Sequence, residues 1–204
     1  MKVIRAARAM RRIAARLRAE GKTIGLIPTM GALHEGHRSL IQTARRRTTA
    51  VVVSLFVNPR QFGPTEDFRR YPRTFAADAR LCRTAGADWL FAPSPTEIYP
   101  AEFETVVEVE QLSRLLCGKA RPGHFRGVTT VVMKLLCLIQ PRYAFFGRKD
   151  YQQSVIVKRM IHDVCLPVTV VICPTVRESD GLACSSRNRY LSGEIGRASC
   201  RERV

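Results

Sequence analysis

Two histidines three residues apart, His34 and His37, follow almost directly on the apolar run 23–27. In this position a buried strand should turn into a helix, whose first turn aims unpaired N–H groups and the positive dipole end at an anion. Gly31 and Gly36 allow close backbone approach, and two imidazoles can donate hydrogen bonds to phosphate oxygens. The pattern indicates a phosphate site, although an isolated His pair can also simply cap a helix. A helical zinc protease motif would need histidines four apart.

Three further strand-like runs, 50–57, 143–146 and 168–173, are each followed by polar residues. The first is followed by two amides, the second by a Lys-Asp pair, and the third by two hydroxyls and a guanidinium. These residues are Asn58, Gln61, Lys149, Asp150, Ser185, Ser186 and Arg187. Ligands of parallel sheets bind beyond the carboxyl ends of the strands, so we expect these segments to meet there. Taken singly, each is also an ordinary turn or helix start.

The elements that must position these residues alternate along the chain. Apolar strand-like runs lie at 23–27, 50–57, 88–92, 105–109, 143–146 and 168–173, the fourth of them alternating like an edge strand; helical patterns lie at 1–20, 37–47, 74–85, 128–139 and 151–163. Such βαβ rhythm predicts an α/β fold with a Rossmann-like, doubly wound parallel sheet and helices on both faces. The first helix should bury a stripe made by Ile4, Ala7, Met10, Ala14 and Leu17.

The formal net charge of +17 would suit a polyanionic partner such as nucleic acid or an anionic membrane. However, arginines are scattered from Arg5 to Arg203 without a long basic block, so we favour neither partner. No apolar run approaches the length of a membrane span. The seven cysteines form no Cys-x-x-Cys pair and mostly lie in apolar runs, which favours reduced thiols and a cytoplasmic protein.

Six segments together match one family. They are Pro-Thr-Met-Gly-Ala-Leu-His-Glu-Gly-His at 28–37, Phe-Val-Asn-Pro-Arg-Gln-Phe at 56–62, Tyr-Pro-Arg-Thr at 71–74, Arg-Pro-Gly-His-Phe-Arg-Gly-Val at 121–128, Phe-Gly-Arg-Lys-Asp-Tyr-Gln-Gln at 146–153 and Asp-Gly-Leu-Ala-Cys-Ser-Ser-Arg-Asn at 180–188. Through them the chain resembles the pantoate–β-alanine ligases, a family of the nucleotidyltransferase superfamily whose domain carries a His-x-Gly-His signature. The resemblance extends from the first strand to Leu191.

The resemblance implies an enzyme of vitamin B5 and coenzyme A biosynthesis. In this family the carboxylate of pantoate attacks the α-phosphate of ATP, giving pantoyl adenylate and pyrophosphate. The amine of β-alanine then displaces AMP. The family further implies Mg²⁺ with the polyphosphate, with no protein ligand assigned to it, and a homodimer.

The resemblance also implies roles for individual residues. His34, His37 and Lys149 are implied as catalytic, His34 and His37 donating to the phosphates. The ATP site is implied to comprise Met30, Gly31, His34, His37, Gly147, Arg148, Lys149, Asp150, Val176, Cys184, Ser185, Ser186 and Arg187. Gln61, Gln153 and Asn58 are implied to hold pantoate and β-alanine, and Tyr71 and His124 to lie near the site.

Three departures from the family pattern stand out. Arg148 occupies a position where the family usually has Glu, and Cys184 replaces a Met or Leu. The resemblance stops near residue 192, and the family continues into a smaller C-terminal domain. We therefore expect a nucleotide- and pantoate-binding domain at 1–175, a phosphate-binding loop and the start of a truncated C-terminal domain at 176–192, and an unrelated tail at 193–204.

Three alternative functions remain. Another small-molecule nucleotidyltransferase would share the His pair, but we would not expect it to carry the segments at 56–62 and 121–128. A basic nucleic-acid-binding module would show binding that depends steeply on salt. The chain could also be an inactive ATP-binding fragment.

Overall fold

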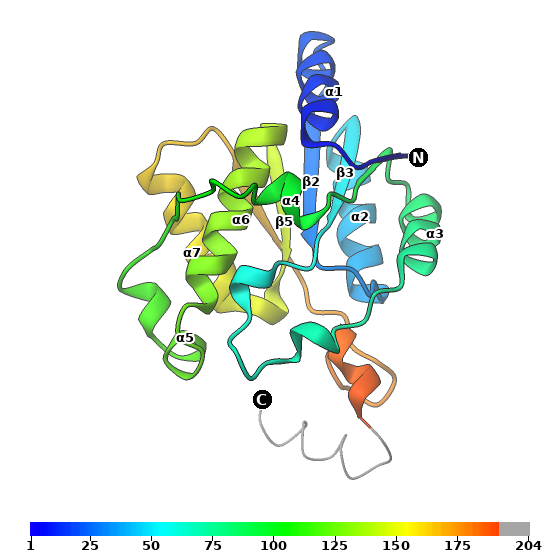
Figure 1. Cartoon of the computed structure of the whole chain (residues 1–204). Helices are drawn as coiled ribbons and strands as arrows, with labels where there is room; N and C mark the ends of the chain where they lie inside the picture. The colour runs from blue at the N-terminus through cyan, green and yellow to red at the C-terminus, as the bar shows by residue number, and fades with distance from the viewer. Residues whose placement is uncertain (192–204) are drawn as a thin grey trace.

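Six parallel strands form one sheet in the order β1-β4-β3-β2-β5-β6 in the computed structural model, which describes residues 1–191 (Figure 1). The strands are β1 (Lys2–Ile4), β2 (Ile24–Thr29), β3 (Ala50–Leu55), β4 (Trp89–Phe91), β5 (Tyr143–Gly147) and β6 (Thr169–Cys173). From the central strand β2 the chain winds outwards through β3 and β4 on one side, and β5 and β6 lie on the other. This is the doubly wound order expected from the alternating pattern.

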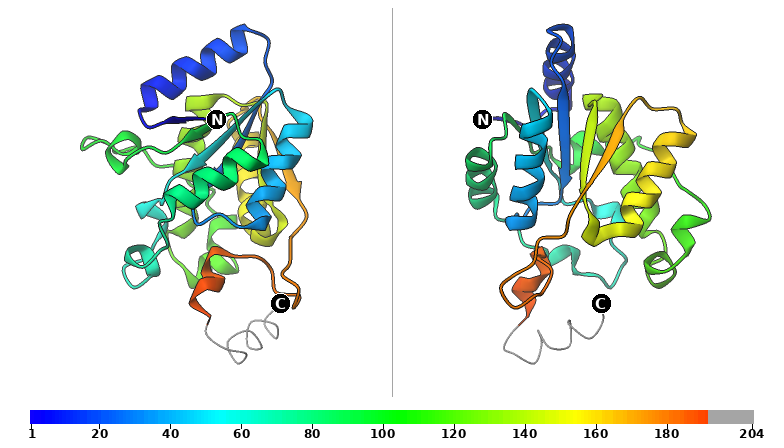
Figure 2. Two further views of the ribbon diagram at one scale, coloured as in Figure 1. Left: turned by 90° about the vertical axis from the view of Figure 1, so that its right-hand side faces the viewer. Right: turned by 180° about the vertical axis from the view of Figure 1, so that it is seen from behind.

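Helices cover both faces of the sheet, as the two views of Figure 2 show. They are α1 (Ala7–Ala19), α2 (Glu35–Arg47), α3 (Phe75–Ala85), α4 (Pro95–Ile98), α5 (Cys117–Ala120), α6 (His124–Ile139) and α7 (Tyr151–Asp163). Helices α1, α6 and α7 pack in one buried cluster, and α2 and α3 pack in a second one on the opposite face. The sheet is therefore the middle of three layers.

Strand side chains alternate between the two clusters. In β2, Ile24 and Leu26 join the cluster under α1, α6 and α7, whereas Ile27 joins the cluster under α2 and α3. In β3, Val52 and Val53 divide in the same way. Both faces of the central strands are buried, which is why these segments are continuous apolar runs in the sequence.

The edge of the sheet differs from the prediction. Residues 105–109 form no strand. The edge of the sheet beside β4 is formed by β1, which lies within the segment predicted as one helix from 1 to 20. The backbone of Val107 is bonded to α6 side chains instead: its N–H donates to the Thr130 hydroxyl at 3.0 Å, and its carbonyl accepts from Thr129. Those hydroxyls replace the ladder of a neighbouring strand. Helix α1 does bury Met10, Ala14 and Leu17, as expected.

The turn between β2 and α2 is fixed by a buried carboxylate from another element. Gly31 and Ala32 both have positive φ, which turns the chain sharply after β2. The backbone N–H groups of Ala32 and Leu33 donate to the carboxylate of Asp78 in α3, at 3.0 and 2.8 Å respectively. The hydroxyl of Thr74 donates to the same carboxylate at 3.2 Å. Asp78 is 1% exposed, so these bonds have no competition from water.

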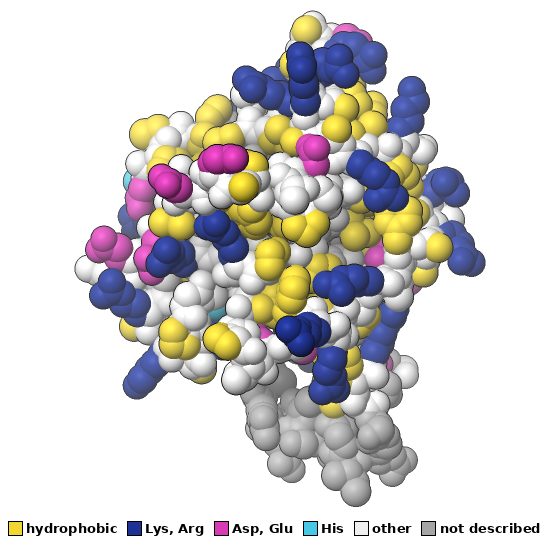
Figure 3. All heavy atoms as spheres, viewed as in Figure 1, with side chains coloured by type: hydrophobic (Ala, Val, Ile, Leu, Met, Phe, Trp, Pro, Cys, Tyr) yellow, Lys and Arg dark blue, Asp and Glu magenta, His cyan; other side chains and the backbone are white. Residues whose placement is uncertain are grey.

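Charged side chains are dispersed over one face of the molecule. On the face drawn in Figure 3, Lys and Arg side chains stand among apolar and neutral ones instead of gathering in one stripe. Within the described residues, no helix is both long and apolar enough to cross a membrane.

We expect Asp78→Asn to destabilise the protein by about 2–3 kcal/mol, because an amide NH₂ would face a buried backbone N–H and leave it without an acceptor. Urea unfolding followed by circular dichroism measures this change. Asp163→Asn, at the exposed end of α7, is the matched control and should leave the urea midpoint nearly unchanged. Equal midpoints for both variants would contradict the anchoring role of Asp78.

Candidate active site

A cavity of about 230 Å³ opens at the carboxyl ends of β2, β3, β5 and β6. It lies where the strand order diverges from β2, towards β3 on one side and β5 on the other. Open α/β sheets bind their ligands at this switch point. The lining combines apolar side chains, among them Phe56, Val132 and Phe146, with polar ones.

His34 and His37 line the cavity at the start of α2, and each imidazole is held by a backbone N–H. The N–H of Gly36 donates to Nδ1 of His34 at 3.2 Å, and the N–H of His34 donates to Nδ1 of His37 at 3.3 Å. The two ring centroids are 4.1 Å apart. Because Nδ1 accepts in both rings, the proton of each neutral imidazole is on Nε2.

Both imidazoles are neutral at physiological pH. Burial, and after it the charge of Lys149, lower the pKa of His34 to about 4. Burial also lowers the pKa of His37 to about 3, with contributions from His34 and Lys149. The pair therefore supplies two uncharged N–H donors with fixed tautomers, at the helix end where a dipole already favours an anion.

The end of β5 brings a cation to the wall of the cavity. Lys149 lines the cavity and its Nζ lies 3.0 Å from the carboxylate of Asp150, which also lines it. Gly147, at the last position of β5, lines the same wall. The neighbouring Arg148 is exposed and does not line the cavity.

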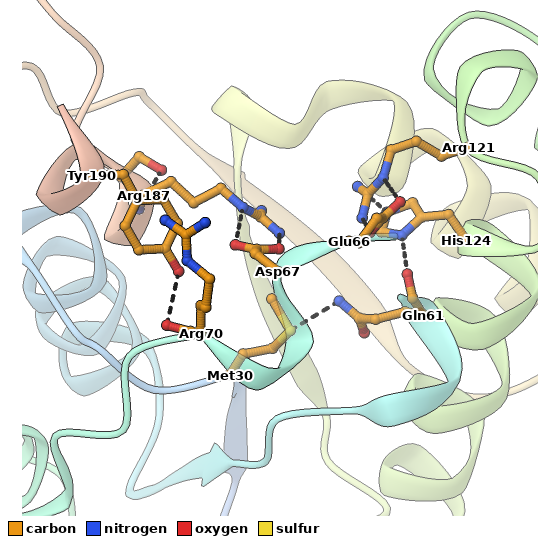
Figure 4. A network of polar contacts seen from close by, with 10 residues as sticks. Met30, Gln61, Glu66, Asp67, Arg70, Arg121, His124, Arg187 and Tyr190 are labelled. Atoms are coloured by element: carbon orange, nitrogen blue, oxygen red, sulfur yellow. Dashed lines mark hydrogen bonds and ion pairs between the residues drawn. The ribbon is translucent and has the colours of Figure 1, made fainter. Parts of the chain in front are cut away.

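The segment after β6 closes one side of the mouth with a short 3₁₀ turn, Ser186–Tyr190. The Ser186 hydroxyl donates to the carbonyl of Ala32 at 3.0 Å, which ties this segment to the turn after β2. The Ser185 hydroxyl accepts from the N–H of Arg187 at 3.3 Å. Arg187 makes a two-pronged ion pair with Asp67, with distances of 2.9 and 2.8 Å (Figure 4).

A second arginine is paired in the same way on the other side. Arg121 lines the cavity and binds both carboxylate oxygens of Glu66, with Nε at 2.8 Å from Oε1 (Figure 4). Its NH1 lies 3.2 Å from Nε2 of His124. Each pairing lowers the pKa of the carboxyl concerned, chiefly through the hydrogen bond from its arginine. The adjacent acids Glu66 and Asp67 thus hold two cavity arginines from distant segments.

Asn58 caps the turn Pro59–Gln61, Gln61 ends it, and the backbone of this turn touches α6. A Cβ on Gly127 would collide with the carbonyl of Arg60, so only glycine allows this approach. Nδ2 of Asn58 donates to the carbonyl of Gly127 at 3.0 Å and to Oε1 of Gln61 at 3.1 Å. Nε2 of Gln61 lies 2.9 Å from the sulfur of Met30 (Figure 4).

Most of the predicted site residues lie together on the wall of this cavity. They are Met30, His34, His37, Asn58, Gln61, Gly147, Lys149, Asp150, Gln153, Val176, Cys184, Ser185, Ser186 and Arg187. Gly31 and Arg148 do not line it; Gly31 instead turns the chain. Tyr71 and His124 lie on the wall, as expected of neighbours of the site.

Sequence reasoning missed several residues of the site. Arg121 lies within the segment 121–128, but the sequence predicted no role for it. Asp78 anchors the turn between β2 and α2 without lining the cavity. The buried hydroxyl of Ser54 lines the cavity and finds no partner within the described part of the chain. A hydroxyl inside the apolar strand-like run 50–57 is the signal that could have pointed to it.

Comparison with known proteins gives consistent matches. The family model for pantoate-beta-alanine ligase matches residues 2–200. The pantothenate synthetase of Moorella thermoacetica is 53% identical over 198 residues, covering 97% of this chain and 70% of the relative. Pantothenate synthetase 1 of Bradyrhizobium diazoefficiens is 56% identical over 194 residues, covering 95% and 69%. The chain thus spans about 70% of the length of these relatives.

Solved structures share the fold. Pantothenate synthetase from Thermus thermophilus superposes with a TM-score of 0.92 at 50% identity, covering 97% of this chain and 70% of that one. The ligase from Francisella tularensis, solved in complex with beta-gamma ATP and beta-alanine, gives 0.93 at 37% identity and covers 100% and 78%. A family match over nearly all residues and this shared architecture agree with the cavity's position, and the chain belongs to the pantoate-beta-alanine ligases, which produce pantothenate.

Proposed function

We propose that the cavity joins pantoate to β-alanine through a pantoyl adenylate formed from ATP. A carboxylate oxygen of pantoate attacks the α-phosphorus of ATP, and the bond to the β,γ-pyrophosphate breaks. The amine of β-alanine then attacks the acyl carbon, loses a proton, and AMP leaves. One observation carries this proposal: two neutral imidazoles with protonated Nε2 atoms lie with Lys149 around one cavity at a helix N-terminus.

Positioning and charge stabilisation account for the chemistry of the first step. Two anions must approach each other, so fixed donors that need no reorganisation lower the barrier most. His34 and His37 donate to the phosphate oxygens as negative charge develops there. Lys149 supplies a full positive charge, and its present partner Asp150 is replaced when phosphate binds. Apolar wall residues such as Phe56, Val132 and Phe146 help to keep water away from the activated acyl group.

The proposed nucleotide site combines residues at the carboxyl ends of β2, β5 and β6. Met30, Gly147, Asp150, Val176 and Cys184 form its walls, with Asp150 on the ribose. Ser185 keeps its hydroxyl proton available for phosphate because its oxygen only accepts from the N–H of Arg187. The Ser186 proton is already used on Ala32, so Ser186 mainly fixes the segment. We propose that residues 1–175 bind the nucleotide and pantoate, and that residues 176–192 comprise the phosphate-binding loop and the start of a C-terminal domain.

Gln61 and Gln153 are proposed to hold pantoate on the cavity wall. Mg²⁺ is proposed to enter with ATP. No three metal-ligating side chains gather among residues 1–191, and Mg²⁺ is usually bound through substrate phosphates and water with one or two carboxylates. We therefore treat it as a partner of the polyphosphate.

We propose further that two copies of the chain associate and that the protein works in the cytoplasm. Leu115 is 55% exposed and Leu116 80% exposed, which leaves an apolar surface suitable for a second copy. The free thiols of Cys82, Cys173 and Cys184 suit a reducing compartment. Sedimentation equilibrium tests the association, and a purely monomeric protein at micromolar concentration would contradict it.

Pantoate-dependent exchange between labelled pyrophosphate and ATP tests the adenylate step directly. If the adenylate forms reversibly, exchange requires pantoate and Mg²⁺ and proceeds without β-alanine. Release of AMP only when β-alanine is present, without any exchange, would instead indicate a concerted reaction and refute the intermediate.

We expect His34→Ala and His37→Ala each to lower this exchange rate by about a hundredfold or more, the usual effect of removing one preorganised donor. His162→Ala changes a histidine whose side chain is 81% exposed, and it should retain the full rate. Thermal unfolding of all three variants separates lost chemistry from lost folding. A normal rate in either cavity variant would remove that imidazole from the mechanism.

Acid should destabilise the fold through these histidines. The folded state keeps His34 and His37 unprotonated down to a pKa of about 4 and about 3, whereas the unfolded chain protonates them near 6.5. The unfolded state therefore binds more protons across this interval, and the free energy of unfolding falls as pH falls. We expect His37→Gln to show a smaller loss than the parent between about pH 7 and about pH 5 in urea titrations. A His37→Gln variant with the same pH dependence as the parent would contradict this role.

A further inference from the structure

Asn58 is held in one orientation by two backbone groups. Its Nδ2 lies 3.0 Å from the carbonyl of Gly127, which can only accept, and its Oδ1 lies 3.3 Å from the N–H of Arg60, which can only donate. Turning the amide over would place like groups against each other at both contacts. Asn58 is 1% exposed, so water cannot compensate for such a loss.

The fixed orientation of the Asn58 amide determines the orientation of the Gln61 amide. The second N–H of Asn58 points at the Gln61 side chain, at 3.1 Å, so Gln61 must present its oxygen there. The Gln61 backbone is held as well, because its carbonyl lies 2.8 Å from Nδ1 of His124 (Figure 4). Nε2 of Gln61 is therefore left towards Met30, whose sulfur is a weak acceptor. A carboxylate or hydroxyl oxygen is a stronger acceptor and would displace it.

Tyr99, outside the motifs that the sequence singled out, completes the chain of bonds. Its hydroxyl lies 2.9 Å from Oδ1 of Asn58, which makes the phenol a donor. Burial raises the pKa of Tyr99 to about 12, so the phenol keeps its proton at physiological pH. With this bond, both donors of Asn58 and its carbonyl oxygen are all engaged within the protein.

We propose that Tyr99 and Asn58 are positioning residues that hold the Gln61 amide with its nitrogen towards the cavity. This subsite then selects an oxygen acceptor of pantoate, and Asn58 itself does not contact the substrate. The proposal rests on the assignment of Gln61 to pantoate made above. The hydrogen bonds of this network run in one direction. Tyr99 donates to Asn58, Asn58 donates to Gln61, and Nε2 of Gln61 remains for the substrate.

A double-mutant cycle on pantoate binding tests this proposal. Calorimetric titration of the 204-residue chain gives dissociation constants for pantoate and, separately, for ATP. We expect Tyr99→Phe to weaken pantoate binding by about threefold to tenfold, the range expected for one net hydrogen bond, with ATP binding unchanged. In a Gln61→Ala background the same change should have an effect below about 1.5-fold, because Tyr99 acts only through Gln61. Tyr143→Phe is the matched control, because Tyr143 begins β5 at the end away from the cavity.

The outcomes separate this proposal from the one on which it depends. Equal effects of Tyr99→Phe in both backgrounds, or no effect in the parent, would overturn the positioning role. A loss of ATP affinity equal to that for pantoate would mean general damage to the cavity and overturn it too. If Gln61→Ala binds pantoate as tightly as the parent, the assignment of Gln61 fails, and the proposal falls with it.

Discussion

A carboxylate buried between two elements controls the geometry of the site. The chain must leave β2, turn through two residues with positive φ, and begin α2 with its histidines at the cavity. Such a turn exposes N–H groups that β2 and α2 cannot satisfy, and a buried N–H without an acceptor is costly. Asp78 accepts two of them from a helix more than forty residues away. The packing of α3 beside this turn therefore stabilises it.

The same dependence on distant backbone groups recurs on the other wall. Gly127 has no side chain, which allows the turn at Pro59–Gln61 to rest against α6, and this contact places the carbonyl of Gly127 beside Asn58. The segment 121–128, which contains Gly127, thus serves first to let the backbone of the turn Pro59–Gln61 pack against α6. The amides of the cavity are oriented as a result of that packing.

The sequence predicted the layers, the strand ends and most of the cavity wall, because these follow from local patterns and recognisable segments. It did not predict the edge strand β1, since three residues carry too little periodicity, nor that the backbone of Val107 would bond to threonines of α6. The roles of Asp78, Arg121 and Tyr99 depend on partners far along the chain. Pattern reasoning cannot pair a carboxylate with an N–H that lies in another element. The expectations for residues 193–204 lie outside the described residues.

The ion pairs around the cavity determine how strongly the basic composition of the chain attracts an anionic ligand. Arg121, Arg187 and Lys149 are bound to Glu66, Asp67 and Asp150, respectively, so these three cations around the cavity are matched by three carboxylates. An incoming polyanion exchanges places with internal anions and displaces few ions of the surrounding electrolyte. Its affinity should therefore respond only weakly to ionic strength, in contrast to attraction by an open basic surface. The chain carries a net charge of +17, yet these three cavity cations are each paired with a carboxylate. They become available to a ligand only when it takes the place of those carboxylates.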